Sequence, residues 1–179
     1  MAETKNDSLI KDLILDLASK DNKILMSALK RVRSKGSEKV IPSLFHIIEK
    51  NEDALIKNEA QSIILELKST ASIPFLLEQL SHEKEEMRLL ALNALWQTGF
   101  NSHENMDKFV TAAIKGSFME AFEAYTIIDN LEGPFEEENI MEAQLVLKSY
   151  FSMANEDEEK FPIMKNIAKQ LANFELSIQ

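Results

Sequence analysis

The stretch "EEMRLLALNALWQTG", residues 85–99, carries the pattern on which the fold prediction depends. Its apolar residues recur every three or four positions, which is the spacing of an amphipathic helix, and Gly99 follows as a residue that ends helices. Arg88 stands directly after the first apolar position, Met87, inside this apolar surface. A cation inside an apolar surface needs a polar partner.

The same pattern recurs along the chain at offsets of 31 and 32 residues. The aligned apolar positions are Ile24, Ala28 and Val32, then Ile56, Ala60 and Ile64, then Met87, Ala91 and Leu95. A second helix follows in each case, because "VIPSLFHII" (40–48) aligns with "SIPFLLEQL" (72–80) and with "NMDKFVTAAI" (105–114). A fourth, weaker pair runs from Ala124 and Ile128 to Ile140, Ala143 and Leu147. Fixed self-similarity of this length is typical of stacked helical repeats.

Composition agrees with a helical fold. The chain has only four glycines and four prolines, strand-like alternation is nowhere sustained, and the breaks delimit about ten short helices. We therefore predict an all-α fold, a right-handed α-α superhelix or solenoid of about four helix pairs, forming a single domain over residues 1–179. Residues 22–152 are expected to form the repeats, and residues 7–19 and 157–175 the helices that cap the two ends.

These residues resemble HEAT-like repeats of the short, phycobilisome-lyase type. "EEMRLLALNALWQTG" is similar to the first helix of such a repeat, with its acidic turn, apolar-Arg pair, central Ala and closing Gly. "SIPFLLEQL" and "VIPSLFHII" resemble the second helix, with an apolar-Pro pair before a Leu-rich run. The first two repeats depart from the pattern, with Leu25 and Lys57 in place of the Arg. The resemblance implies the HEAT/armadillo-like fold and says little about function.

The resemblance also implies a role for Arg88. In such stacks the arginine lays its stem along the apolar interface and directs its guanidinium to carbonyls or carboxylates of the adjacent turn or repeat. We predict a structural role of this kind for Arg88, with contact to a ligand as the alternative.

Charge and composition restrict the function. A net charge of −10 argues against general binding to nucleic acid or to anionic membranes, which requires neutralising cations. The absence of cysteine fits a reducing compartment, the first twenty residues lack the pattern of a signal peptide, and no run is apolar enough to span a bilayer. We expect a cytoplasmic protein that does not associate with membranes.

No catalytic motif is present, and we expect neither a metal nor a cofactor. The three histidines, His46, His82 and His103, lack the spacing that places two ligands on one helix face. The acidic runs 83–86, 136–138 and 156–159 lie at turns or helix starts, where carboxylates favour the positive end of the helix dipole. Trp96 is interpreted as a core or half-core residue.

The favoured function is a non-catalytic scaffold that binds a protein or peptide on the concave face lined by the second helices. Phe75 beside Pro74 is either an exposed anchor or, if the register is one residue off, part of the core. The residues predicted to contact the partner are Ser43, His46, Glu49, Phe75, Glu78, Gln79, Lys108, Thr111, Ala112 and Lys115.

Other interpretations stay open. The family resemblance also implies a lyase or accessory protein acting on a chromophore-bearing or otherwise modified partner, or a DNA-repair glycosylase, which the net charge disfavours. A structural part of a larger assembly or a homo-oligomer is a third possibility, and the sequence leaves the oligomeric state open. The basic cluster between Lys30 and Lys39 is either a solvated turn or a docking site for an acidic partner.

Overall fold

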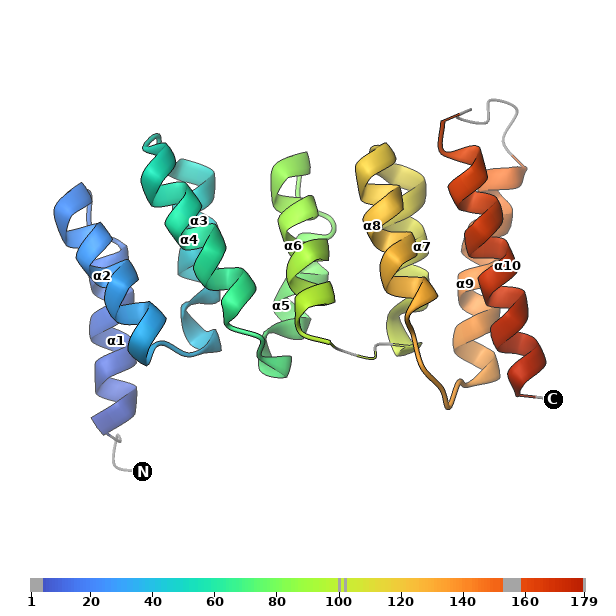
Figure 1. Cartoon of the computed structure of the whole chain (residues 1–179), viewed down its shortest axis with the longest axis horizontal. Helices are drawn as coiled ribbons and strands as arrows, with labels where there is room; N and C mark the ends of the chain where they lie inside the picture. Colours follow the sequence, from blue (N-terminus) through green and yellow to red (C-terminus); the bar gives the residue numbers. More distant parts are fainter. Residues whose placement is uncertain (1–4, 100, 102, 153–158, 179) are drawn as a thin grey trace. The chain divides into compact units, whose positions relative to one another are not determined.

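The computed structural model describes residues 5–99, 101, 103–152 and 159–178, and every regular element within them is a helix (Figure 1). The α-helices are α1 (Lys5–Leu17), α2 (Asn22–Lys35), α3 (Ile41–Lys50), α4 (Ala54–Glu66), α5 (Ile73–Gln79), α6 (Glu85–Gln97), α7 (Met106–Lys115), α8 (Phe118–Asp129), α9 (Glu137–Phe151) and α10 (Phe161–Ser177). Three short 3-10 helices are η1 (Glu38–Val40), η2 (Thr70–Ser72) and η3 (His103–Asn105). For these described residues the all-α prediction is confirmed, as is the expectation of about ten short helices.

The chain divides into two compact units, residues 1–76 and residues 77–179, which we call unit 1 and unit 2. Helices α1 to α4 belong to unit 1 and α6 to α10 to unit 2, while α5 crosses the boundary. Each unit is described by itself. The single domain expected over residues 1–179, and its superhelical path, stay predictions.

Unit 1 consists of two helical layers. Helices α1 and α3 pack side by side in one layer and α2 and α4 in the other, while α1 also packs on α2 and α3 on α4 (Figure 1). Fully buried side chains from all four helices meet between the layers, among them Leu13, Leu29, Leu44 and Ile63. Burial of each such side chain contributes about 1.5–3 kcal/mol to folding.

Unit 2 repeats this layered packing. Helices α7 and α9 form one layer and α6, α8 and α10 the other, with α7 packed on α8 and α9 on α10 (Figure 1). Phe109 of α7 is among its fully buried side chains. Alanines at 0% exposure, including Ala91, Ala113 and Ala124, allow the helix backbones to approach closely at these contacts.

Local structure repeats with the period found in the sequence. A 3-10 helix precedes each of α3, α5 and α7, and Pro42 and Pro74 occupy the same second position of α3 and α5. Proline is favoured there because its ring sets a helical φ and the first helical turn has no use for its missing N–H. At the corresponding position of α7 stands Asp107, an acidic residue in the first turn. The starts of these helices therefore repeat with the period of the sequence.

Two helix starts are capped in the same way. The Asp21 side chain accepts hydrogen bonds from the first backbone N–H groups of α2, and Asp53 does the same for α4. Asp53 also accepts a hydrogen bond of 3.3 Å from the side chain of Asn22, so the cap of one helix contacts the start of the other. Helix α8 begins with a complete capping box of Ser117 and Glu120.

Side-chain bonds link residues 31 to 33 positions apart in both units. In unit 1 they join Asn22 to Asp53, Lys39 to Asp7 and Arg33 to Glu66; in unit 2 they join Arg88 to Glu120, Asn101 to Glu132 and Gln144 to Glu175. This separation equals the sequence period, and all of these bonds except Gln144 to Glu175, which joins α9 to α10 within one pair, connect corresponding positions of successive helix pairs.

One core position of the alignment is wrong. Ile24 was aligned with Ile56 and Met87, which are both buried, yet its side chain is 47% exposed, and Leu25 at 2% takes the core position. Ile24, Ile56 and Met87 are all the third residue of their helices, so the difference comes from the packing of α2 on α1 and α4, which buries Leu25 instead. One turn further on, Ala28 and Val32 are buried as predicted.

The terminal helices both belong to packed pairs, α1 with α2 and α10 with α9. Their bounds, Lys5–Leu17 and Phe161–Ser177, lie within two residues of the predicted ends 19 and 175, while the predicted start of the last helix, residue 157, lies outside the described residues. That these helices cap the repeats stays a prediction.

Candidate interaction surface

Helix α3 presents a polar strip that contains three of the predicted contact residues. Leu44, Phe45 and Ile48 face the core, because α3 packs on α1 and α4. His46 is exposed on the opposite side, and Ser43 and Glu49 are half-buried beside it. Glu49 forms an ion pair of 2.9 Å with Lys50. His46 is thus the most accessible of the three for contact with another molecule.

Phe75 is only partly available to a partner. Its ring meets the ring of buried Phe45 edge-on, with centroids 5.2 Å apart and an interplanar angle of 81°. The side chain is half-buried, so the structure combines the two alternatives of anchor and core residue. Replacing it would disturb the packing of unit 1 as well as any surface contact.

Helices α5 and α7 carry the remaining predicted residues. Glu78, Lys108 and Lys115 are exposed, and Gln79 and Thr111 are half-buried, with the Thr111 hydroxyl donating a 2.8 Å hydrogen bond to the Asp107 carbonyl. Ala112 is buried, and its selection as a contact residue is wrong. The reason is that α7 packs on both α8 and α9, which widens its buried face.

The predicted contact residues fall in both units. Ser43, His46, Glu49 and Phe75 belong to unit 1, and the other six belong to unit 2. Each group faces outward from its own unit, apart from Ala112. That they form one continuous surface stays a prediction.

Most of the basic cluster is paired within the chain. Arg31 pairs with Asp16, Lys39 with Asp7, and Arg33 with both Glu59 and Glu66. These cations join α2 and the following turn to α1 and α4. These intramolecular ion pairs argue against the cluster being a docking site for an acidic partner.

Arg88 answers the question raised by its position in the sequence. Its Nε donates to Oε1 of Glu120 at 2.6 Å and its Nη2 to Oε2 at 3.2 Å, while Nη1 donates to the carbonyls of His82 and Glu83. The guanidinium thereby joins the turn before α6 to the first turn of α8. The predicted contacts with carbonyls and a carboxylate of the adjacent turn and repeat are confirmed.

Glu120 is the most buried carboxylate described, with 1% of its surface exposed. Burial raises the pKa of its carboxyl group, but the hydrogen bonds from Arg88 and from the Ser117 backbone lower the pKa by more, so the net shift is downward. The Ser117 N–H donates to Oε2 at 2.7 Å. Glu120 is therefore an ionised, fully hydrogen-bonded group that holds α6 against α8.

The histidines show no shared site. The Nδ1 atom of His82 accepts a hydrogen bond from the Lys84 backbone at 3.0 Å, and the His103 ring lies edge-on to Phe135. Among the described residues, no cluster of three or more acidic or histidine side chains has an arrangement suited to a metal ion. None of the helices in the described part of the chain is long and apolar enough to cross a bilayer.

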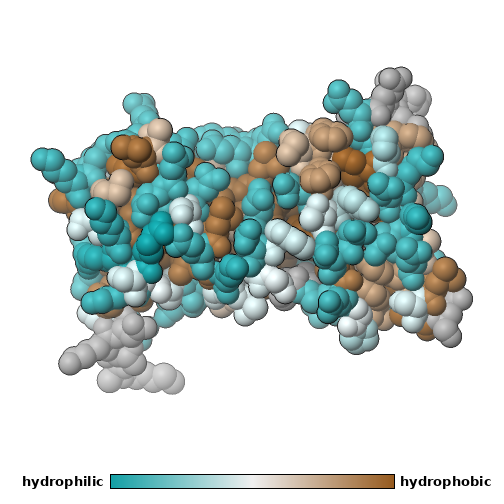
Figure 2. Space-filling view, viewed as in Figure 1, coloured by the Kyte–Doolittle hydropathy of each residue, from teal (hydrophilic) through white to brown (hydrophobic). Residues whose placement is uncertain are grey.

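A surface that the sequence analysis missed lies on α8. Phe118, Met119 and Phe122 are 43%, 49% and 48% exposed, and we call these three residues the α8 patch. Figure 2 shows apolar side chains gathered over the first half of this helix. The stretch "SFMEAFEA" (117–124) mixes alanines with large apolar residues and glutamates, and the weak fourth repeat was predicted only from Ala124 onward.

Trp96 of α6 is also more accessible than expected. Its side chain is 39% exposed. Of the two predicted alternatives, a core residue is wrong, and a half-core residue is closer to what the structure shows. It stands one residue before the end of α6, where the helix runs out to the turn at Gly99.

A shallow groove crosses unit 1 between α2 and α4. Its volume is about 450 Å³, and it is lined by Met26, Leu55 and Ile56 together with polar residues of α2 and Asp53. This volume is near the lower end of the range found for small-molecule sites.

Comparison with models of known protein families gave no match, and comparison with curated proteins gave none either.

Proposed function

We propose that this chain is a non-catalytic scaffold for protein–protein interaction, built as a HEAT-like solenoid that holds a protein or peptide on its concave face. The observation that supports this most directly is the set of side-chain bonds 31 to 33 residues apart that join α2 to α4 in unit 1 and α6 to α8 in unit 2. Stacking of this kind leaves one side of each helix in a layer facing outward, and repeat proteins bind their partners with such extended faces.

The faces proposed for binding are the exposed sides of α3 in unit 1 and of α7 in unit 2. His46 on α3 and Lys108 on α7 are exposed, and neither is needed to complete the core. An exposed histidine and an exposed lysine suit hydrogen bonding and charge contact with a protein or peptide. The cytoplasmic location stays a prediction.

The test is affinity capture from native cytosol with the purified full chain and two double variants. The test variant is His46→Ala with Lys108→Glu, which leaves Phe75 in place because that ring packs on Phe45. The matched control is Gln61→Ala with Lys169→Glu, which makes the same types of change on α4 and α10, in the other layer of each unit. Circular dichroism and urea midpoints confirm that all three proteins are folded.

We expect one protein to be retained by the wild type and the control and lost by the test variant. Retention by both variants would reject the α3 and α7 faces as the binding surface. A wild-type chain that retains no protein at all would reject the scaffold function.

A further inference from the structure

The α8 patch inverts the usual distribution of side chains on a surface helix. The buried side of α8 carries small residues, Ala121 and Ala124, together with Ile127 and Ile128, whereas the side turned to solvent carries two phenylalanines and a methionine. A surface helix ordinarily keeps its largest apolar side chains inside. Between 43% and 49% of the surface of these three side chains is exposed, and this apolar surface is available for contact with another molecule.

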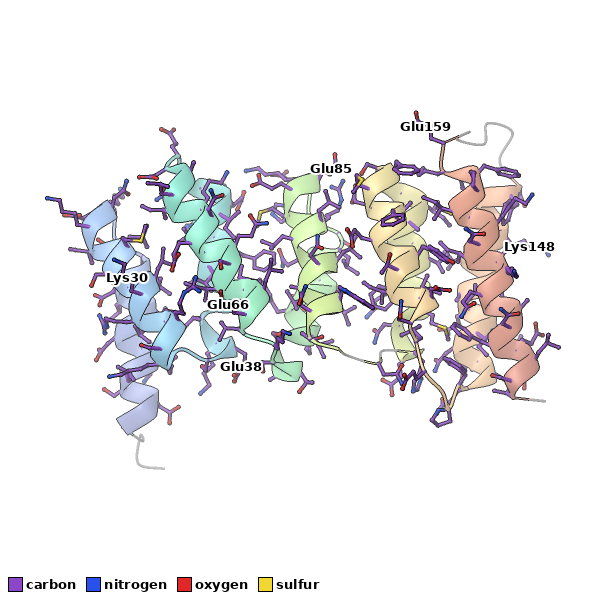
Figure 3. All side chains as sticks on the ribbon, in the orientation of Figure 1. Lys30, Glu38, Glu66, Glu85, Lys148 and Glu159 are labelled. Carbon is purple, nitrogen blue, oxygen red and sulfur yellow. The ribbon has the colours of Figure 1, made fainter. Side chains whose placement is uncertain are left out.

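Carboxylates lie on both sides of the patch, alongside the exposed side chains of Lys84 and Lys115. The bond between Arg88 and Glu120 holds the first turn of α6 beside the first turn of α8, which places Glu85 and Glu86 at the same end of unit 2 as Phe118. Lys160 donates to the carbonyls of Ile114 and Gly116, which brings Glu159 to this end from the other side. In Figure 3 the labelled Glu85 and Glu159 lie at the same edge, on either side of α8.

The charge of the whole chain is concentrated in unit 2. Residues 77–179 contain 19 acidic and 8 basic residues, a net charge of −11, whereas residues 1–76 contain 11 acidic and 12 basic residues, a net charge of +1. Lys165, which lies over the Phe161 ring, is a basic residue in the second turn of α10, but the unit as a whole strongly attracts cations.

We propose that the α8 patch binds a basic amphipathic helix of a partner protein, whose apolar stripe covers Phe118, Met119 and Phe122 while its lysines or arginines face the acidic residues around them. A helix is favoured because the patch extends over little more than one turn of α8, a strip on which the side chains of a second helix can interdigitate. A second copy of unit 2 or an anionic membrane would bring like charges together. The inference rests on the proposed protein-binding function and gives it a second surface with a defined partner chemistry.

The test uses fluorescence anisotropy with the full chain and a labelled synthetic peptide that has leucines on one helix face and lysines on the other. Two control peptides are used. The first has the same composition in scrambled order and therefore lacks the apolar stripe. The second keeps the order but has glutamate in place of every lysine. The protein variants are Phe118→Ser with Phe122→Ser and, as the matched control, Met141→Ser with Leu145→Ser. The control pair has the same spacing and is also exposed in unit 2, on α9.

We expect the basic amphipathic peptide to bind at least about tenfold more tightly than either control peptide, since it alone combines the stripe and the charge. The substitutions in the α8 patch should weaken this binding at least about tenfold, and the α9 substitutions should leave it unchanged. A second pair of variants does not depend on the apolar core: Glu85→Lys should weaken binding more than Glu142→Lys, although both change the net charge equally.

Three results would overturn the inference. The first is equal binding of the scrambled peptide, or equal loss of binding in the α8 and α9 variants, which would mean general attraction to an acidic protein. The second is a dimer in sedimentation that the α8 substitutions abolish. The third is binding to vesicles of phosphatidylcholine and phosphatidylserine that depends on the same residues. A protein captured through His46 and Lys108 would uphold the scaffold function in each of these cases.

Discussion

Arg88 shows how a charged side chain can be required by an apolar interface. Its guanidinium donates four hydrogen bonds, to two carbonyls and to both oxygens of a carboxylate that is itself buried, so the pair acts as a bridge between α6 and α8. A buried pair of this kind gives little net stability compared with apolar residues, but removing one partner leaves the other charge buried and unpaired.

Arg88→Ala should therefore lower the free energy of unfolding by about 3–5 kcal/mol, because the Glu120 carboxylate would be left without its cation in the interior. Urea denaturation monitored by circular dichroism measures this loss. The control is Arg33→Ala, which removes an arginine bound to two more exposed carboxylates and should cost much less, because water screens these pairs. Similar losses in the two variants would contradict the role given to Arg88.

The pKa of Glu120 predicts the pH dependence of this bridge. Because the pKa in the folded chain is lowered, the carboxylate stabilises the fold above its unfolded pKa of roughly 4.3–4.5 and loses that contribution as the pH falls through the lower, folded value. Glu120→Gln should thus be less stable than the wild type at pH 7, and the difference should shrink below about pH 4.5. Urea midpoints of both proteins measured between neutral and acidic pH test this, and a constant difference would contradict it.

Gly99 ends α6 with a positive φ of 63°, a left-handed conformation that a side chain makes unfavourable. A Cβ atom added there would meet no heavy atom within 4 Å, so Gly99→Ala should cost only the conformational penalty, about 1–2 kcal/mol. Thermal or urea unfolding measures this value. Gly116→Ala is the contrasting case, because its Cβ would lie 2.7 Å from the Ala112 carbonyl oxygen and should cost more. A larger loss at Gly99 would point to a role beyond its backbone angle.

Helix α10 is attached to the rest of unit 2 by hydrogen bonds between residues that lie far apart in the sequence. The Nζ atom of Lys160, whose residue is 6% exposed, donates hydrogen bonds of 2.8 and 2.9 Å to the carbonyls of Ile114 and Gly116 at the end of α7. A cation at the carboxyl end of a helix also interacts favourably with the helix dipole. The lysine thus satisfies carbonyls that α7 cannot bond internally.

Lys160→Met should destabilise the chain by about 1.5–3 kcal/mol, since two hydrogen bonds from a charged donor are lost and the carbonyls remain buried. Lys169→Met, on the exposed side of the same helix, should change stability by no more than about 0.5 kcal/mol. Hydrogen exchange should show faster exchange of the amides of α10 in the first variant only. Unchanged exchange there would mean that α10 is held by its apolar contacts alone.

Helix positions were predictable to within a few residues because their signals are local. The apolar-Pro starts at Ile41-Pro42 and Ile73-Pro74 and the end at Gly99 all act within one turn of the helix concerned. The α8 patch was not predictable in this way. Its sequence mixes large apolar residues with glutamates, and which residues face the core depends on where α6, α7 and α10 lie around α8.

The charge asymmetry between the two units has a consequence for stability. The net charge of −11 in unit 2 opposes its compact state by self-repulsion, whereas unit 1 is nearly neutral. Salt at about 0.5 M screens charges separated by more than a few ångströms, so it should stabilise unit 2 more than unit 1.

Hydrogen exchange measured by mass spectrometry at low and high sodium chloride concentration tests this prediction on the full chain. Amide protection should increase more for peptides from residues 77–179 than for those from residues 1–76. Sodium sulfate strengthens apolar burial as well, so a comparison of the two salts separates screening from that general effect. An equal gain in both units with sodium chloride would reject the electrostatic explanation.

The helical class, the period of about 32 residues and the helix ends were all contained in the sequence, because helix formation, capping and chain reversal depend on interactions within a few residues. Burial is different, since it is set by the helices that pack opposite a residue. Packing placed Leu25 rather than Ile24 in the core, buried Ala112, left Phe118 and Phe122 exposed, and brought Glu120 to Arg88 across 32 residues of chain. A periodic pattern identifies the residues that repeat, but the partner of each side chain exists only once the helices have stacked.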